Sequence, residues 1–83
     1  MTDRVTAIRE AAALARFYAD ENLEMAGDSV LLDPCLRGEG LTAENIARSK
    51  SLQITGCIHS AAYHAGRHIE ANILALIGEK AND

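Results

Sequence analysis

The sequence predicts an all-α protein, a small helical bundle of two long antiparallel helices plus one shorter helix. Apolar residues recur every three or four positions over two stretches of similar length, which is the repeat of an amphipathic helix. Both stretches are rich in alanine, and small side chains allow two helices to approach closely. With 83 residues, the chain is long enough for a single domain over residues 1–83 and too short for two.

The first long helix is expected over residues 2–26. Thr2 or Asp3 can cap its N-terminus, and Gly27 stands where a helix often ends in a left-handed residue. One face of this predicted helix is apolar and consists of Val5, Ile8, Ala12, Ala15, Ala19 and Leu23.

Residues 28–40 are expected to connect the helices. The apolar run at residues 30–32 predicts a short extended segment that packs under the helices. Asp33 precedes Pro34, which disfavours helical geometry at Asp33. Residues 37–40 contain two glycines and predict a flexible turn.

A short helix is expected to begin at Thr42, which can serve as its N-cap, and a second long helix is expected over residues 57–78. Residues 49–56 leave two alternatives open, because Gly56 is tolerated inside a helix at a cost of about 1 kcal/mol relative to alanine. The chain either continues as one helix or breaks near residues 50–56. An apolar stripe at helical spacing consists of Ile54, Ile58, Ala61, Ala65, Ile69, Ile73 and Leu76.

The composition bears on the kind of partner. Eight Lys and Arg against twelve Asp and Glu give a net charge of −4, and nucleic-acid binding depends on clustered cations. Nucleic acid is therefore not the expected partner. Phe17, Tyr18 and Tyr63 are the only aromatic residues, and a small core of small side chains often needs self-association. We expect a homodimer built through the alanine-rich helix faces.

The sequence predicts a cytoplasmic protein without a membrane segment. No apolar run follows Met1, so no signal peptide is expected. The most apolar stretch, residues 69–77, is interrupted by Glu70 and is too short to span a bilayer. Cys35 and Cys57 lack CxxC spacing and fit reduced thiols, with a single disulfide between them as the alternative.

Negative charge is concentrated in residues 17–36, which carry five acids and neither Lys nor Arg. We expect an acidic patch that docks on a basic surface of another protein, with Phe17 as an apolar anchor. An ordinary solvated helix face is the alternative interpretation. The candidate partner-binding residues are Phe17, Asp20, Glu21, Glu24, Asp28 and Asp33.

The histidine-rich segment CIHSAAYHAGRH, residues 57–68, is the candidate metal site. His64 and His68 are four residues apart and lie on the same helix face, which is a two-ligand spacing. Cys57 lies about 10 Å farther along the helix axis, too far to bind the same zinc ion. A complete site would need Cys35 or the histidine pair of a second subunit. The simpler interpretation is that both histidines border the apolar stripe.

No catalytic set and no cofactor are expected. Ser60 and His64 are four residues apart, but no acidic residue occurs between Glu44 and Glu70 to orient the histidine as a base. The turn at residues 38–40 is not followed by the GKS or GKT of a phosphate loop. The chain is therefore not expected to be an enzyme.

Residues 41–65 resemble a helix-turn-helix, with a second helix from residue 53 onward. Lys50 stands where an apolar residue is usual, and Ser51 replaces the usual turn glycine. Arg67 is the only base near the would-be recognition helix. The same residues also fit a plain helix-loop-helix.

Together these observations favour a small acidic helical protein that acts by protein–protein interaction. We expect an inhibitor or regulator whose acidic patch occupies a basic site on a nucleic-acid-handling partner. In size and charge the chain is similar in kind to small phage-encoded inhibitors of host machinery, which is an analogy of type only. A DNA-binding regulator and a metal-binding protein that uses the histidine pair are the alternatives.

Overall fold

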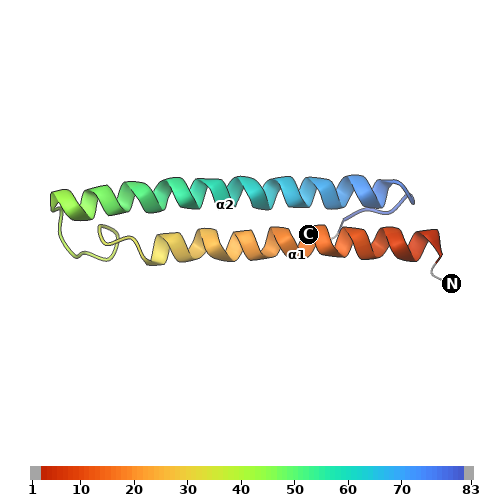
Figure 1. Ribbon diagram of the computed structural model, residues 1–83, viewed down its shortest axis with the longest axis horizontal. Helices are drawn as coiled ribbons and strands as arrows, with labels where there is room; N and C mark the ends of the chain where they lie inside the picture. Colours follow the sequence, from red (N-terminus) through yellow and green to blue (C-terminus); the bar gives the residue numbers. More distant parts are fainter. Residues whose placement is uncertain (1–2, 82–83) are drawn as a thin grey trace.

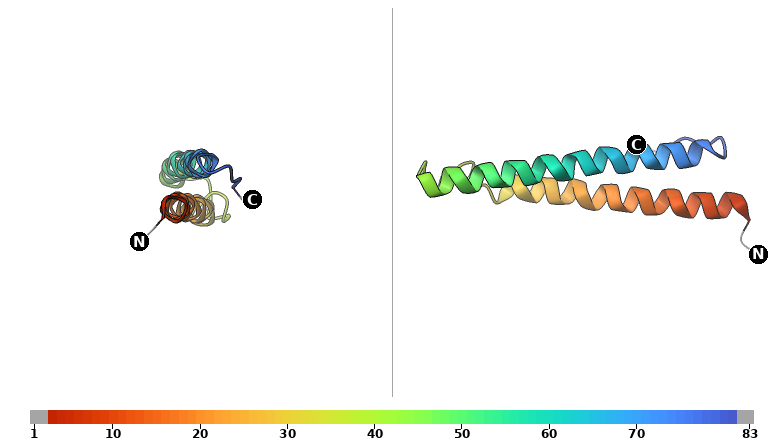
Figure 2. Two further views of the ribbon diagram at one scale, coloured as in Figure 1. Left: turned by 90° about the vertical axis from the view of Figure 1, so that its right-hand side faces the viewer. Right: turned by 45° about the horizontal axis from the view of Figure 1, so that its top comes forward.

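The protein is a hairpin of two long antiparallel helices, as the computed structural model in Figure 1 shows for residues 3–81. Helix α1 spans Arg4–Leu31, and helix α2 spans Ala43–Ala75. The molecule is a rod of 59 × 18 × 17 Å, and the two helices lie side by side in every view (Figures 1 and 2). The structure confirms the all-α class and the antiparallel pair of long helices.

Both helices begin at side-chain caps that the sequence predicts. Asp3 accepts a hydrogen bond from the Thr6 amide at 2.7 Å through its carboxylate. Thr42 accepts one from the Asn45 amide at 3.1 Å through its hydroxyl. Each bond satisfies one of the backbone N–H groups that the first turn of a helix leaves without a partner.

The predicted end of the first helix at Gly27 is wrong. Gly27 is helical, and a Cβ at this position would meet no atom within 4 Å, so nothing in its surroundings ends the helix. The chain leaves the helix after Leu31, just before Asp33 and Pro34, where proline disfavours helical geometry. Residues 30–32 are consequently not an extended segment under the helices: all three side chains are half exposed or more.

The predicted third, shorter helix is also absent from the part of the chain that the structure describes. Residues 43–56 are the first turns of α2, which runs unbroken through 33 residues. Gly56 faces α1, where a Cβ would lie 3.5 Å from the Cβ of Ser29. Gly56 is therefore a contact residue within one helix and not a break between two.

The helices meet along a seam of mostly small or polar residues that repeats at intervals of four and three. The α1 side of the seam is Ile8, Ala12, Ala15, Ala19, Asn22, Ala26, Ser29 and Asp33, all buried or half-buried. The α2 side is Asn45, Ser49, Leu52, Gly56, His59, Tyr63, Gly66, Glu70 and Ile73, also all buried or half-buried. This spacing is the heptad repeat of a left-handed helix pair, here made with side chains that allow close approach.

Few apolar residues are buried in this seam. Among the described residues, Ala12 and Ala19 are buried in the seam, and Pro34 is buried in the connector. Many large aliphatic residues point away from it instead: Ile54, Ile58, Ile69 and Leu76, four members of the stripe seen in the sequence, are each at least half exposed. Of the stripe, Ile73 lies in the seam, and the other members are exposed away from α1. Neither described helix is long and apolar enough to cross a membrane.

Candidate functional site

The end of the hairpin near the connector is held by the buried carboxylate of Asp33, which is 1% exposed. One oxygen accepts hydrogen bonds from the Cys35 amide at 2.9 Å and the Leu36 amide at 3.4 Å. The other accepts a hydrogen bond from the Ser49 hydroxyl of α2 at 2.7 Å. The bond from Ser49, together with those from Leu36 and Cys35, holds the pKa of Asp33 below its usual value.

This geometry removes Asp33 from the predicted partner-binding set. All the bonds of its carboxylate point into the hairpin, and the Ser49 hydroxyl is itself held by the amide of Gln53 at 3.2 Å. Asp33 joins the connector to α2 and presents no charge to a partner. The sequence could have indicated this role, because an aspartate before proline often accepts bonds from amides two and three residues later.

The middle of the seam contains a second polar bridge. The side-chain amide of Asn22 donates to the Tyr18 carbonyl at 2.9 Å, which leaves its oxygen as the acceptor for Nδ1 of His59 at 2.8 Å. His59 must therefore carry its proton on Nδ1 in this pair. The bond explains why His59 faces α1 and lies apart from the other two histidines.

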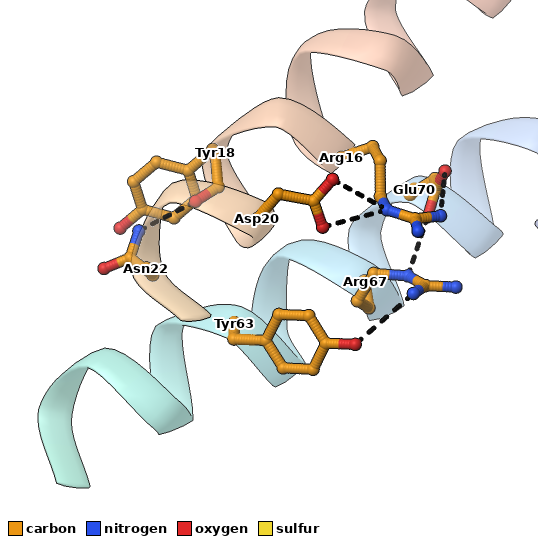
Figure 3. Close-up of polar contacts among 7 residues, drawn as sticks. All are labelled: Arg16, Tyr18, Asp20, Asn22, Tyr63, Arg67 and Glu70. Atoms are coloured by element: carbon orange, nitrogen blue, oxygen red, sulfur yellow. Dashed lines mark hydrogen bonds and ion pairs between the residues drawn. The ribbon is translucent and has the colours of Figure 1, made fainter. Parts of the chain in front are cut away.

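A cluster of charged side chains lies toward the other end of the hairpin, on one flank (Figure 3). Glu70 is 7% exposed and pairs with Arg67 at 3.0 Å and with Arg16 of α1 at 3.7 Å. Arg16 also donates from Nε to both carboxylate oxygens of Asp20, at 3.1 and 3.2 Å. The Tyr63 hydroxyl accepts from Arg67 at 3.4 Å. Opposite charges compensate one another throughout this cluster, so it serves to join α1 to α2.

The remaining predicted partner-binding residues lie on the outer side of α1, away from the seam. We call Phe17, Asp20, Glu21, Glu24 and Asp28 the acidic face; all five side chains are exposed. Asp20 forms an ion pair with Arg16. No described residue forms an ion pair or hydrogen bond with the side chains of Glu21, Glu24 and Asp28. Phe17 is 63% exposed beside them. The structure thus brings five of the six predicted residues onto one surface.

The candidate metal pair, His64 and His68, is exposed on α2. Within residues 3–81 no group of three or more His, Cys, Asp or Glu side chains is placed to hold a metal ion. The ring of His64 instead contacts the ring of Tyr63 edge-on, with centroids 5.2 Å apart. Cys35 and Cys57 are free thiols and form no disulfide. The two histidines therefore have a ligand spacing without the further donors that a zinc site requires.

The segment that resembles a helix-turn-helix is helical without interruption from Ala43 onward. It has no turn near residues 50–56, so the geometry that would present a second helix to a DNA groove does not form in this hairpin.

One flank of the hairpin, which the sequence interpretation missed, carries apolar residues in the half away from the connector and charged residues in the half nearer to it. On both helices, the residues that immediately precede the seam positions lie on one side of the hairpin. This side is opposite the charged cluster. On this side Ala11, Leu14 and Tyr18 of α1 and Ala62, Ala65 and Ile69 of α2 are apolar, whereas Glu21 and Asp28 of α1 and Glu44 and Arg48 of α2 are charged. Once the seam is recognised as small and polar, the same repeat identifies this flank in the sequence.

No protein-family model, no curated protein and no solved structure matches this chain.

Proposed function

We propose that the protein acts by binding another protein, and that the acidic face of α1 docks on a basic surface of that partner. The observation that carries the proposal is the exposure of Glu21, Glu24 and Asp28 without a neutralising neighbour among residues 3–81. Three unpaired carboxylates on successive turns of one helix produce a local negative potential that attracts and orients a basic partner.

Phe17 gives the acidic face an apolar contact. Aromatic residues are enriched at the centres of protein interfaces, where a large ring is buried at a small entropic cost. Phe17 lies one helical turn from Glu21 on the same side of α1. A partner that contacts both residues would bury the ring and pair the carboxylate in one step. Asp20 contributes less, because Arg16 already compensates its charge.

The partner best suited to this face is one whose basic site normally binds phosphates. A row of carboxylates at helical spacing competes for the same Lys and Arg side chains that neutralise a nucleic-acid backbone. Occupation of that site would make the protein an inhibitor or regulator of a nucleic-acid-handling protein. The net charge of −4 favours this role over direct binding of nucleic acid.

A charge-reversal pair tests the proposal. Glu21→Lys/Glu24→Lys removes the acidic face, and Glu39→Lys/Glu44→Lys changes the net charge by the same amount near the connector. Proteins that co-purify with the wild type should be lost with the first variant and kept with the second. Every protein that is lost with the first variant and kept with the second should then bind the purified wild type directly. Its affinity should fall as the salt concentration rises. Equal retention by both variants would contradict a role for the acidic face.

The inhibitor role has its own test. A partner identified in this way should release a bound DNA or RNA oligonucleotide when the wild type is added, and should keep it when Glu21→Lys/Glu24→Lys is added. Simultaneous binding of the oligonucleotide and the wild type would show that the acidic face does not occupy the phosphate site.

A further inference from the structure

The side of α2 that points away from α1 carries large apolar side chains that are exposed to solvent. Ile54 is 63% exposed and Ile58 is 62% exposed, one helical turn apart. Ala61 and Ala65 continue the row over the next two turns and are also exposed. We call Ser51, Ile54, Ile58, Ala61, Ala65 and His68 the outer face of α2; all six side chains are exposed.

The outer face of α2 is uncharged over its whole length. From residue 51 to residue 75 the charged residues of α2 are Arg67 and Glu70, and both belong to the cluster that joins α2 to α1. In the end-on view of Figure 2, the connector and the segment after α2 both project to one side of the helix pair, so neither covers this face. Contiguous apolar surface of this kind usually marks a site of association.

The outer face has the spacing of a second helix–helix seam. Its residues follow one another at intervals of three and four, as the residues of the seam toward α1 do. Helix α2 therefore has a contact repeat on two opposite sides, and α1 covers one of them. The buried apolar residues of the described chain are Ala12, Ala19 and Pro34, and a small domain with so little apolar burial often gains stability by association.

We infer that the outer face of α2 binds the same face of a second copy of this chain, antiparallel and related by a two-fold axis. When the axis passes midway between residues 59 and 60, Ile54 lies opposite Ala65 of the partner subunit. Ile58 then lies opposite Ala61 of the partner subunit. Each large side chain meets a small one, as a well-packed interface requires.

The same axis passes through the middle of α2, because the helix spans Ala43–Ala75. The two α2 helices would consequently overlap along nearly all of their 33 residues, or about 50 Å. A strip of this length and about 10 Å wide has a projected area on the order of 500 Å². Interlocking side chains bury more accessible surface than this projection, which brings the contact to the lower range of specific interfaces, about 600 Å² per partner.

The charges of α2 favour the antiparallel orientation. It separates Lys50 from the partner's Lys50 by about 28 Å along the helix axis and leaves Glu44 and Lys50 at the ends of the contact, where water remains. A parallel pair would instead place Lys50 beside the partner's Lys50 and stack Ala61 and Ala65 on their own counterparts, which combines like charges with gaps. The acidic face of α1 stays on the outside of the dimer, so dimerisation and the proposed partner binding use opposite sides of the hairpin.

Two matched substitutions separate this face from the rest of the surface. Ile58→Glu places a carboxylate at the centre of the outer face, and Leu14→Glu makes the same change of charge on α1, at a side chain that is 72% exposed. In sedimentation equilibrium at about 100 μM, the wild type and Leu14→Glu should have twice the 8.9 kDa chain mass. Ile58→Glu should weaken the dimer by about 100-fold or more, because the two-fold interface would bury two unpaired charges. A monomeric wild type at this concentration, or equal dissociation of the two variants, would overturn the inference.

Cross-linking tests the orientation with substitutions that leave the outer face uncharged. In a Cys35→Ser/Cys57→Ser background, two chains that carry Ala61→Cys would have their thiols offset by roughly 5 Å along the helix axis, so a short bis-maleimide should join them. Ala47→Cys is the matched control, because Ala47 is also exposed on α2 but would lie about 38 Å along the axis from its counterpart and should not cross-link. Cross-linking of both variants would show a parallel pair, and cross-linking of neither would show that the faces do not meet; either result would overturn the inference.

Discussion

Gly66 of α2 packs directly against Ala19 of α1: a Cβ on Gly66 would lie 2.9 Å from the Cβ of Ala19 and 3.2 Å from its Cα. Helix backbones approach this closely only where both side chains are small. The contact sets the register of the seam, since it places Asn22 opposite His59 and Ser29 opposite Gly56 farther along the hairpin.

Gly66→Ala should therefore destabilise the protein by about 1–2 kcal/mol, although alanine is the better helix former by about 1 kcal/mol. The nearest atoms are the Ala19 methyl group and the backbone of Ala15 and Ala19, none of which can rotate away. Gly27→Ala is the matched control, because its new methyl group would meet no atom within 4 Å. This control should be stabilised by about 0.5–1 kcal/mol. Urea denaturation measures the free energy of unfolding of both variants. If Gly66→Ala were more stable than the wild type, the two helices would be farther apart than the structure shows.

The bridge between Asn22 and His59 should appear as a coupling free energy. Asn22→Ala and His59→Ala each remove one side of the 2.8 Å hydrogen bond and leave the other without its partner. A double-mutant cycle should give an interaction of about 0.5–1.5 kcal/mol. The same cycle between Asn22 and the exposed His68 is the control and should give a value near zero. Additive effects at Asn22 and His59 would place the two side chains apart.

The hydrogen bond from Ser49 to Asp33 predicts a particular pH dependence. The native bonds hold the pKa of Asp33 below its ordinary value of 3.8, so this carboxylate stabilises the fold fully above about pH 5. Its contribution is lost as the pH falls below 3.8 through the native pKa. Ser49→Ala should thus be less stable than the wild type at pH 7. The difference in the free energy of unfolding between the two proteins should become smaller below about pH 4.

The control for this pH series is Ser51→Ala, whose exposed side chain does not contact Asp33. The stability of Ser51→Ala should equal that of the wild type at every pH. Thermal unfolding recorded from pH 7 to pH 2.5 provides the comparison. A difference between Ser49→Ala and the wild type that grows in acid would contradict the assigned bond.

Removal of metal should have no effect on stability. His64 and His68 are two exposed donors without a third in the described part of the chain. Native mass spectrometry and thermal unfolding, each before and after a chelator, should give the same mass and the same midpoint. A stoichiometric ion that is lost with chelator, and lost again in His64→Ala/His68→Ala, would instead identify a site shared between two subunits.

Local signals in the sequence were sufficient for the all-α class and for the N-caps of both helices, but not for the number of helices. Thr42, and Asp3 as an alternative to Thr2, were expected as caps because short polar side chains satisfy the first amides of a helix. The end of α1 was misplaced because glycine is a common but not obligatory stop. Gly27 faces solvent and stays helical, while Asp33 before Pro34 carries the bonds that turn the chain.

The packing could not be predicted from apolar periodicity, because the apolar stripe and the contact face of α2 have only Ile73 in common. Gly56 and Gly66 face α1, where their lack of a side chain lets the helices approach, whereas Ile54 and Ile58 point outward. A hydrophobic stripe normally indicates the buried face of a helix. Here it indicates a surface that the hairpin itself leaves uncovered. The acidic face was predictable because Glu21 and Glu24 need no tertiary context to be exposed.

The most direct test of this hairpin register is a disulfide between positions 29 and 56, where the Cβ of Ser29 and a Cβ on Gly56 would be 3.5 Å apart. That separation lies at the short end of the range that disulfides span. In a Cys35→Ser/Cys57→Ser background, Ser29→Cys/Gly56→Cys should oxidise within one chain and migrate faster than its reduced form on a denaturing gel, without a change in mass beyond two hydrogens. Cross-links that join two chains, or none at all, would contradict the register and with it the outward position of Ile54 and Ile58.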